Sequence, residues 1–401
     1  MKKRVAVLGA TGSVGKSAID VISQETDDFE LVLLSAHSDR EGLEKLGRAW
    51  PGAELVLAGG PGGRERLLTA IAAAEAHITI NGIAGAAGLE PSMAVIEAGS
   101  DLALANKETV VMAGKQVFNQ AAVHKVNILP MDSEHSAIFH LIRRGDLFSP
   151  APWGDCILYN QAAERVPDTP AVRGIEEWPE TALDEILLTA SGGPFRQWSL
   201  DKMAGASPEA ALAHPTWNMG PKISIDSASM ANKGLEIIEA TRFFNIPPEK
   251  IKVVIHPQSI VHSMIRLRDG AVYAQLARPD MRLPIHQVLY WPNSRPTGFG
   301  RLDFESLTLE FEKPDTKRFP MLSLAREAVL RDGLYPCAYN AANEVAVAAF
   351  LRREIGFLDI PRIVAYVLNK DWGGEPADIA PVLEADTRAR TIAKVFMKDK
   401  I

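Results

Sequence analysis

Strand-like apolar runs alternate with helical patterns over the first third of the chain, and this alternation constrains the fold more than any other feature. The first run is RVAVL (4–8) and the last is VNILPMDSE (126–134). Strands that alternate with helices build a parallel sheet with helices on both faces, because each crossover returns the chain in the same direction. We therefore predict a doubly wound, Rossmann-like α/β domain over residues 1–131.

The character of the chain changes after this domain. Residues from about 142 to 184 are rich in Pro, Gly and charge, which predicts an irregular insertion. Strand patterns around it and a hairpin signal at RDG (268–270) predict a central α+β catalytic domain with a mixed sheet over 132–290. Within it, ISID (223–226) predicts the edge of a strand. A linker is expected over 291–316 and an α-helical domain over 317–401.

Composition excludes several classes of protein. The 401 residues are 47% hydrophobic and carry a net charge of −7, whereas a nucleic-acid-binding protein would present a basic surface. The two cysteines predict neither a disulfide framework nor a cysteine zinc site. No apolar run approaches the ~18 residues of a membrane span, and the one at the start is too short for a signal peptide. We expect a cytoplasmic protein with a small-molecule ligand, no nucleic-acid partner and no membrane contact.

The segment GATGSVG (9–15) joins the first predicted strand to the first predicted helix. Its glycines, Gly9, Gly12 and Gly15, allow a tight turn and let a phosphate approach the backbone at the helix N-terminus. This placement predicts a dinucleotide site, although the same spacing also occurs in turns that only connect a strand to a helix.

The end of the second predicted strand bears on the choice between NADH and NADPH. An acidic residue there binds the ribose hydroxyls, whereas basic and hydroxyl groups bind a 2′-phosphate. His37, Ser38 and Arg40 favour NADPH, and Asp39 favours NADH. We predict NADPH.

Two acidic residues, Asp132 and Glu134, end the last strand of the series, and in an extended chain they would share one face. Two adjacent carboxylates repel each other unless a cation joins them, and oxygen ligands suit Mg²⁺ or Mn²⁺. Glu236 is the candidate third ligand. The alternative is that Ser133 caps a helix, with Glu134 in its first turn.

Polar residues crowd the segment DSASMANKGLE (226–236). On a helix Asn232 and Glu236 share a face, so Ser227, Asn232 and Lys233 could bind a phosphate while Glu236 points at the metal. The alternative is a capped amphipathic helix with a solvated polar face. Glu239 is interpreted as a supporting or surface acid.

Two glycine-containing loops complete the candidate site. Ser191 and the two glycines after it follow an apolar strand, which suits either a phosphate contact or an ordinary turn. The segment HPTWNMG (214–220) combines His214 and Trp217 with helix breakers. It predicts a lid that excludes water from a ligand, or a structural loop with a docked Trp.

Taken together, these motifs resemble one family over nearly the whole chain, the 1-deoxy-D-xylulose 5-phosphate reductoisomerases of the non-mevalonate isoprenoid pathway. The resemblance rests on GATGSVG, LANKE (104–108), MDSEHSAIF (131–139), SGGPF (191–195), HPTWNMGPKIS (214–224), DSASMANKGLE, HPQSIVHSM (256–264) and PDMRLPI (279–285).

The resemblance implies a role for each candidate residue. The metal ligands would be Asp132, Glu134 and Glu236. The substrate would meet Ser133, Ser191, His214, Ser227, Asn232, Lys233 and Glu236, and the catalytic set would be Lys107, Ser133, Glu134, His214 and Trp217. The cofactor would meet Thr11, Gly12, Ser13, Val14, His37, Ser38, Arg40, Asn106, Glu108, Met219, Gly220 and Met281.

The resemblance also implies the reaction. The metal would polarise the ketone and adjacent hydroxyl of the sugar phosphate, and the skeleton would rearrange by retro-aldol cleavage and re-addition. NADPH would then reduce the aldehyde to 2-C-methyl-D-erythritol 4-phosphate. A homodimer is expected from the family.

Three segments depart from the family pattern. The stretch around 55–80 is shorter and the one around 142–184 is longer. At positions 37–39 the family usually has Gly, then Lys or another polar residue, then Asn or Ser, whereas this chain has His37-Ser38-Asp39. This difference bears on cofactor preference.

Two other functions would fit parts of the sequence. A reductase of acyl phosphates needs a nucleophilic cysteine, but Cys156 lies in the insertion and Cys337 in the helical region. A non-catalytic sugar-phosphate or nucleotide sensor could use the same fold, and metal-dependent turnover separates it from an enzyme.

Overall fold

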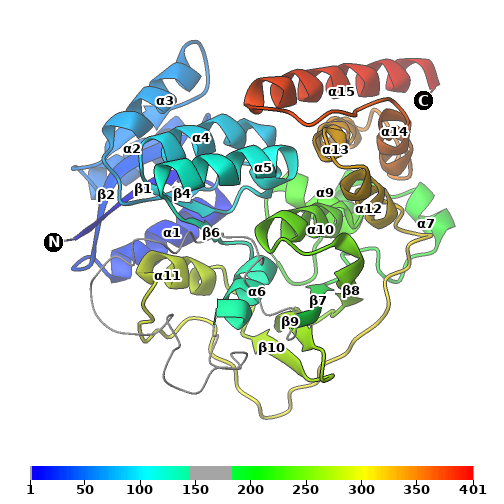
Figure 1. Ribbon diagram of the computed structural model, residues 1–401, viewed down its shortest axis with the longest axis horizontal. Coiled ribbons are helices and arrows are strands. Elements are labelled where there is room, and N and C mark those ends of the chain that lie inside the picture. Colours follow the sequence, from blue (N-terminus) through cyan, green and yellow to red (C-terminus); the bar gives the residue numbers. More distant parts are fainter. Residues whose placement is uncertain (1, 144–182, 218, 401) are drawn as a thin grey trace.

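The computed structural model describes residues 2–143, 183–217 and 219–400 (Figure 1). The predicted insertion at about 142–184 therefore lies almost wholly outside the described residues, and Asn218 of the predicted lid lies outside them too.

The N-terminal domain is the predicted doubly wound sheet. Its six strands are all parallel and lie in the order β3-β2-β1-β4-β5-β6. The sheet grows to one side of β1 with β2 and β3 and to the other side with β4, β5 and β6, so the order of strands reverses between β1 and β4. Ligands of such sheets bind at the carboxyl ends of the strands beside this reversal. The strands are β1 (Lys3–Leu8), β2 (Phe29–Ala36), β3 (Glu54–Leu57), β4 (Ile78–Asn81), β5 (Asp101–Leu104) and β6 (Ile128–Pro130). The helices are α1 (Ser13–Gln24), α2 (Arg40–Ala49), α3 (Gly63–Ala73), η1 (Gly85–Gly88), α4 (Leu89–Glu97) and α5 (Lys107–His124).

The central region contains the predicted mixed sheet, in the order β10-β9-β7-β8. Strand β7 is parallel to β8 and antiparallel to β9, and the predicted hairpin joins β9 to β10. Its strands are β7 (Leu183–Ala190), β8 (Ile251–Ile255), β9 (Val261–Leu267) and β10 (Val272–Leu276). The helices of this region are α6 (Ser133–Arg143), α7 (Leu200–Ala204), α8 (Pro208–Leu212), α9 (Pro221–Ala228), α10 (Ala231–Phe243), η4 (Pro248–Lys250) and α11 (Arg282–Tyr290).

One predicted element is wrong: ISID lies in helix α9 and not at the edge of a strand. The helix begins after Gly220 with a proline at its first position, where the missing N–H costs nothing. Ser224, Ile225 and Asp226 are all buried, so polar residues at interior positions imitated the alternation of a strand. Met230, at φ 63°, separates α9 from α10.

Beyond the linker, the chain is helical as predicted. Helix α13 (Tyr335–Leu351) lies between α12 (Met321–Arg331), α14 (Asp359–Leu368) and α15 (Ile379–Lys400) (Figure 1). It is buried over most of its length and also contacts α5 and α9, so the helical region shares surfaces with both other parts of the chain.

Helix α11 crosses back to the N-terminal domain and packs against α1. Arg282 pairs with Asp20 at 3.0 Å, and the Tyr290 hydroxyl donates to an Asp28 oxygen at 2.6 Å. These contacts place α11 along the C-terminal half of α1 and the turn that follows it.

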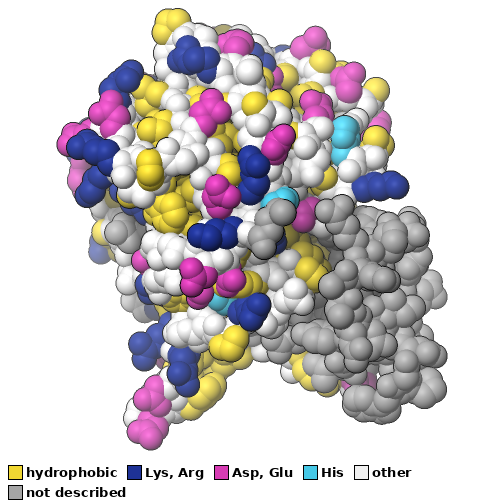
Figure 2. All heavy atoms as spheres, turned by 90° about the vertical axis from the view of Figure 1, so that its left-hand side faces the viewer, with side chains coloured by type: hydrophobic (Ala, Val, Ile, Leu, Met, Phe, Trp, Pro, Cys, Tyr) yellow, Lys and Arg dark blue, Asp and Glu magenta, His cyan; other side chains and the backbone are white. Residues whose placement is uncertain are grey.

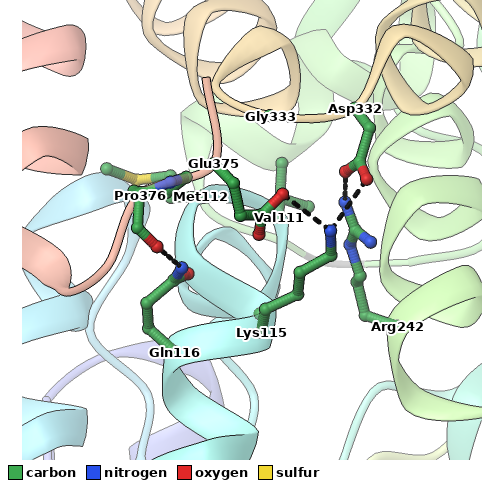
Figure 3. A pocket seen from close by; sticks show the side chains of 10 residues that line it. Val111, Met112, Lys115, Gln116, Arg242, Asp332, Gly333, Glu375 and Pro376 are labelled. Carbon is green, nitrogen blue, oxygen red and sulfur yellow. Dashed lines mark hydrogen bonds and ion pairs between the residues drawn. The ribbon is translucent and has the colours of Figure 1, made fainter. Parts of the chain in front are cut away.

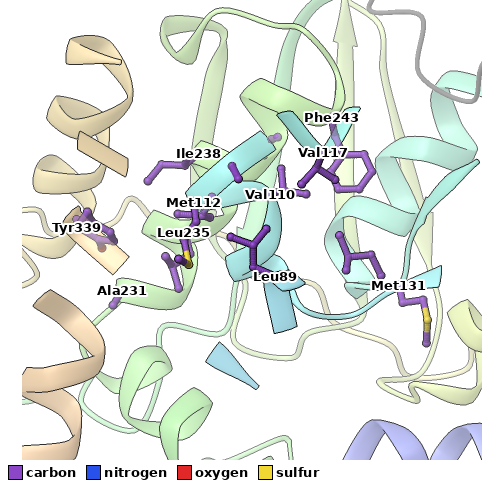
Figure 4. Packing of buried hydrophobic residues seen from close by; sticks show 14 of the residues in the cluster. Leu89, Val110, Met112, Val117, Met131, Ala231, Leu235, Ile238, Phe243 and Tyr339 are labelled. Carbon is purple, nitrogen blue, oxygen red and sulfur yellow. The ribbon is translucent and has the colours of Figure 1, made fainter. Parts of the chain in front are cut away.

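The core continues from the N-terminal domain into the central region through α5 and α10. Figure 4 shows Val110 and Met112 of α5 lying toward Leu235 and Ile238 of α10. All four side chains are almost fully buried, and burying an aliphatic side chain stabilises by about 1.5–3 kcal/mol. The two domains therefore share one apolar interface beside the candidate site.

On the face shown in Figure 2, Lys and Arg side chains are interspersed with Asp and Glu side chains. Within the described residues, no helix is both long enough and apolar enough to span a bilayer.

Gly15→Ala should destabilise the N-terminal domain. A Cβ at Gly15 would lie 2.3 Å from the Gly9 carbonyl oxygen, and backbone cannot move aside cheaply. We expect a loss of about 1–3 kcal/mol in the free energy of unfolding, measured by urea denaturation. Gly52→Ala is the control, because a Cβ there meets nothing within 4 Å. Equal midpoints for both variants would contradict the packing described here.

Candidate active site

The predicted carboxylates lie where β6 ends and α6 begins. The Asp132 carboxylate accepts from the Glu134 backbone N–H at 3.2 Å, and its carbonyl accepts from Ser136 N–H at 2.7 Å. Asp132 thus takes the capping position that was predicted for Ser133. Because the helix starts at Ser133, the predicted alternation of an extended chain does not apply.

Helix α10 brings the third predicted acid to the first two, and two ammonium groups join them. Lys107 Nζ lies 2.5 Å from Asp132 Oδ2 and 3.0 Å from Glu236 Oε1. Lys233 Nζ lies 2.7 Å from Glu134 Oε1 and also contacts Glu236 Oε2. We call these five residues the ion cluster.

Two further predicted residues complete the polar surroundings of the ion cluster. Asn232 donates from Nδ2 to Glu236 Oε1 at 2.6 Å and accepts from Lys107 at 2.9 Å. Ser133 donates to Glu134 Oε2 at 2.5 Å. The structure therefore gathers residues from α5, α6 and α10 that lie up to 129 positions apart.

Burial and charge work against each other in the ion cluster. Burial alone would lower the pKa of Lys107, but the neighbouring carboxylates, Asp132 first, raise it well above its ordinary value. Burial raises the pKa of Asp132, but Lys107 outweighs this and holds it well below its usual range. Burial and the Glu236 charge together raise the pKa of Glu134. Both lysines remain charged at neutral pH.

His135 and Glu239 also belong to this site, and sequence reasoning missed the histidine. The His135 ring lies 3.5 Å from both Asp132 Oδ1 and Glu239 Oε2, and Nε2 lies 3.2 Å from the Glu236 carbonyl oxygen. Burial alone would lower the pKa of His135, but Glu239 and Asp132 outweigh it and raise the pKa to about 9. Glu239 is 1% exposed, so it is a buried supporting acid and not a surface one.

The donors of the ion cluster fit a divalent cation. Asp132, Glu134 and Glu236 supply hard oxygen ligands, and the two ammonium groups show that they converge on positive charge. One ligand atom each from Asp132, His135 and Glu236 also lie within 4.8 Å of one another. Both His135 nitrogens already face other oxygens, so we assign it to orienting Asp132.

A second group of predicted residues forms around the turn after β7. Ser191 Oγ lies 3.0 Å from His214 Nε2. The other nitrogen of His214, Nδ1, accepts from the backbone N–H groups of Thr216 and Trp217, at 3.1 and 2.9 Å. In the neutral ring Nε2 therefore carries the proton that is donated to Ser191. Burial lowers the pKa of His214, which favours this neutral form.

The same turn lies against α9. Gly193 has φ 67°, and a Cβ there would approach the Ser227 carbonyl oxygen to 2.6 Å. Only glycine fits both this conformation and this approach. The turn that carries Ser191 is thus packed on the segment that carries Ser227.

The predicted cofactor turn joins β1 to α1. Gly9 has φ 78°, and a Cβ there would lie 3.0 Å from the Gly82 carbonyl oxygen, so the turn closes on β4. Gly12 caps α1 without a side-chain hydrogen bond, which leaves N–H groups of the first turn, at Ser13 and Val14, for an anion. Thr11 lies between the two glycines.

The structure shows how Asp39 is used. Its Oδ1 accepts from the Gly42 backbone N–H at 2.9 Å and caps α2. A carboxylate that caps a helix is held away from the ribose hydroxyls by its own hydrogen bond, while His37, Ser38 and Arg40 around it are exposed.

The first turn of α5 carries two predicted cofactor residues. Asn106 caps the helix by accepting from Thr109 N–H at 3.0 Å and donates to the Ile83 and Gly85 carbonyls. Glu108 pairs with Lys222, which the sequence did not single out. Lys222 and Asp226 lie at i and i+4 in α9, a relation that the predicted strand concealed.

The remaining predicted cofactor residues lie at the starts of helices. Gly220 caps α9, with Met219 before it, and Met281 precedes α11 beside α1.

An open helix N-terminus at the reversal point of a Rossmann sheet, beside an ion cluster formed with α5, α6 and α10, is typical of a dinucleotide-binding protein of the Rossmann type. The sequence comparisons specify the family. Models of 1-deoxy-D-xylulose 5-phosphate reductoisomerase match residues 5–59 and 58–114, its C-terminal domain model matches 128–244, and a DXP reductoisomerase C-terminal domain model matches 276–392. The chain belongs to the 1-deoxy-D-xylulose 5-phosphate reductoisomerase family.

Individual relatives agree with this assignment. The 1-deoxy-D-xylulose 5-phosphate reductoisomerase of Treponema denticola is 41% identical over 411 residues, covering 100% of this chain and 98% of its own. The solved reductoisomerase of Zymomonas mobilis in complex with NADPH is 37% identical, with a TM-score of 0.82 and full coverage of both chains. A DOX-P reductoisomerase solved with NADPH, fosmidomycin and magnesium is 34% identical, with a TM-score of 0.84, covering 99% of this chain and 98% of its own.

Lys107→Met should strongly destabilise the metal-free protein. Removing the ammonium leaves Asp132 and Glu236 without their shared counter-charge in a buried site, which costs about 3–5 kcal/mol. We expect a lower melting temperature in EDTA and a partial recovery with Mn²⁺, both measured by thermal denaturation. If Mn²⁺ stabilises the variant no more than the unsubstituted protein, the carboxylates do not converge on a cation.

Proposed function

We propose that this chain converts 1-deoxy-D-xylulose 5-phosphate to 2-C-methyl-D-erythritol 4-phosphate, with NADPH as reductant and Mg²⁺ or Mn²⁺ as the metal. The observation that carries the proposal is the ion cluster, because it sets three acids and two lysines beside a dinucleotide-binding domain. Family membership over the full chain and a related structure solved with NADPH and magnesium support it.

Asp132, Glu134 and Glu236 would hold the metal. When bound, a divalent ion supplies Lewis-acid polarisation of the ketone and hydroxyl oxygens of the substrate. Lys107 and Lys233 give the acids counter-charge before binding, and their ammonium groups can then turn to the oxygens of the substrate. Ser133, beside Glu134, has a hydroxyl that can donate to the same oxygens.

The phosphate group would lie between the turn after β7 and the start of α10. Ser191, Ser227, Asn232 and Lys233 supply hydroxyl, amide and ammonium donors there, and neutral His214 orients Ser191. Binding a phosphate away from the reacting carbons releases free energy that can hold the carbon skeleton in a reactive geometry. Trp217 would cover the bound substrate.

NADPH would lie along the β1–α1 turn, with its pyrophosphate at the first turn of α1. Its 2′-phosphate would meet His37, Ser38 and Arg40, because Asp39 is held by its capping bond. Asn106, Glu108, Met219, Gly220 and Met281 would flank the nicotinamide half. We further propose a homodimer located in the cytoplasm, as the family expectation implies.

The function is tested by mixing the purified protein with 1-deoxy-D-xylulose 5-phosphate and Mn²⁺ and following the loss of NADPH or NADH absorbance. We expect metal-dependent oxidation of NADPH that fosmidomycin inhibits, and little oxidation of NADH. Oxidation of neither cofactor would favour a sugar-phosphate or nucleotide sensor.

Glu236→Gln should retain the fold and lose metal-dependent activity. The amide removes the charge that both ammonium groups and the metal require, so kcat should fall at least about 100-fold, or about 2.7 kcal/mol in activation free energy. The measurements are steady-state kinetics and the Mn²⁺ affinity by electron paramagnetic resonance. Glu327→Gln, at an exposed ion pair in α12, is the control. Unchanged Mn²⁺ affinity in Glu236→Gln would exclude it as a ligand.

A further inference from the structure

A buried ion pair outside the ion cluster ties three parts of the chain together. Lys222, in the first turn of α9, contacts Glu108 Oε1 and lies 2.9 Å from Asp226 Oδ2. Glu108 is 4% exposed and Asp226 is 0% exposed, so their polar partners come from the protein and not from solvent. We call Glu108, Lys222 and Asp226 the α5–α9 tie.

The helical region is built into this tie. Asn343 of α13 donates from Nδ2 to Asp226 Oδ1 at 2.7 Å. The next residue, Glu344, accepts from the Ala86 backbone N–H at 2.9 Å in η1 of the N-terminal domain. Helix α13 thus bonds to Asp226 of the tie and packs against both α5 and α9, above α9 and beside α5 in Figure 1.

The electrostatics keep Lys222 and Glu108 ionised. Burial lowers the pKa of Lys222, but Asp226 and Glu108 outweigh it and raise the pKa above its ordinary value. Burial raises the pKa of Glu108, and Lys222 outweighs it so that the pKa is lowered. Such a pair contributes little net stability compared with apolar side chains, yet removing one partner is costly. Its effect is therefore to hold the helices in one relative position.

The α5–α9 tie lies between the ion cluster and the proposed phosphate site. Glu108 directly follows Lys107 of the ion cluster, and its carboxylate accepts a hydrogen bond from the Asn106 amide at 3.0 Å. Asp226 directly precedes Ser227 of the phosphate group's proposed site. A shift of α5 against α9 would move the cofactor domain relative to the bound substrate.

We propose that Lys222 is a positioning residue: by tying α5 to α9, with α13 behind them, it sets the distance between the nicotinamide and the substrate for hydride transfer. This inference rests on the proposed function and adds to it a role for the helical region.

The test compares Lys222→Met with Lys115→Met in the full chain. Lys115 lies in the same helix α5, about 12 Å along its axis from Lys107, and pairs with Asp332 at 2.8 Å and Glu375 at 2.9 Å (Figure 3). Both variants remove one ammonium from two carboxylates, but the Lys115 pairs lie about two helical turns along α5 from the ion cluster.

For Lys222→Met we expect kcat to fall about tenfold or more, the KM for the sugar phosphate to stay within about threefold, and the deuterium isotope effect with NADPD to rise. The isotope effect rises because misplacement slows hydride transfer itself. Lys115→Met should match the unsubstituted protein in all three. Equal kcat and isotope effects in the two lysine variants would overturn the proposal.

A second measurement needs no turnover. Hydrogen exchange followed by mass spectrometry should show faster exchange at residues 106–110 in Lys222→Met than in Lys115→Met, and equal exchange would overturn the tie. If Lys222→Met does not fold, Lys222→Gln, which keeps a neutral NH2 donor group for the two acids, replaces it in both experiments. Absence of turnover in the unsubstituted protein would count against the proposed function, and the exchange result would still decide the tie.

Discussion

The pairing of buried acids with buried lysines is the interaction on which the rest of this structure depends. The Glu236 side chain is fully buried and that of Asp132 is 12% exposed, and an unpaired buried charge costs several kcal/mol. The counter-charges come from α5 and from α10 itself. The N-terminal domain and the central region must therefore meet at the ion cluster for either to keep its charges satisfied. The apolar contacts of α5 with α10 then extend this junction into a shared core (Figure 4).

The start of α5 concentrates several tasks in consecutive residues. Asn106 caps the helix, Lys107 enters the ion cluster, and Glu108 joins the tie to α9. Because these side chains also have different partners, one short segment contacts the cofactor domain, the central region and the proposed substrate position together. This arrangement explains why a Rossmann domain and a separate metal-binding region can act on one ligand.

Local patterns predicted most of the fold and the chemical types of the site. The alternation of strands and helices, the glycine turn and the hairpin signal each depend on neighbours in the chain, so they are visible without a structure. The prediction failed in α9, where polar residues at buried positions imitated a strand. The capping alternative named Ser133, whereas Asp132 caps the helix; Ser and Asp both suit a cap, and only the geometry distinguishes them. His135 was overlooked because its partners, Glu239 and the Glu236 carbonyl, belong to another helix.

The sequence alone determined that a dinucleotide-binding α/β domain precedes an acid-rich region, since these features follow from local periodicity and from the residue types within single segments. Tertiary structure decided which charges meet. Lys107 could have been an exposed helix residue, but it is buried between the carboxylates of Asp132 and Glu236. Asp39 could have bound a ribose, but its carboxylate caps a helix and accepts from a backbone N–H. Ion pairs between distant segments depend on packing across the whole chain, and no local sequence pattern encodes that packing.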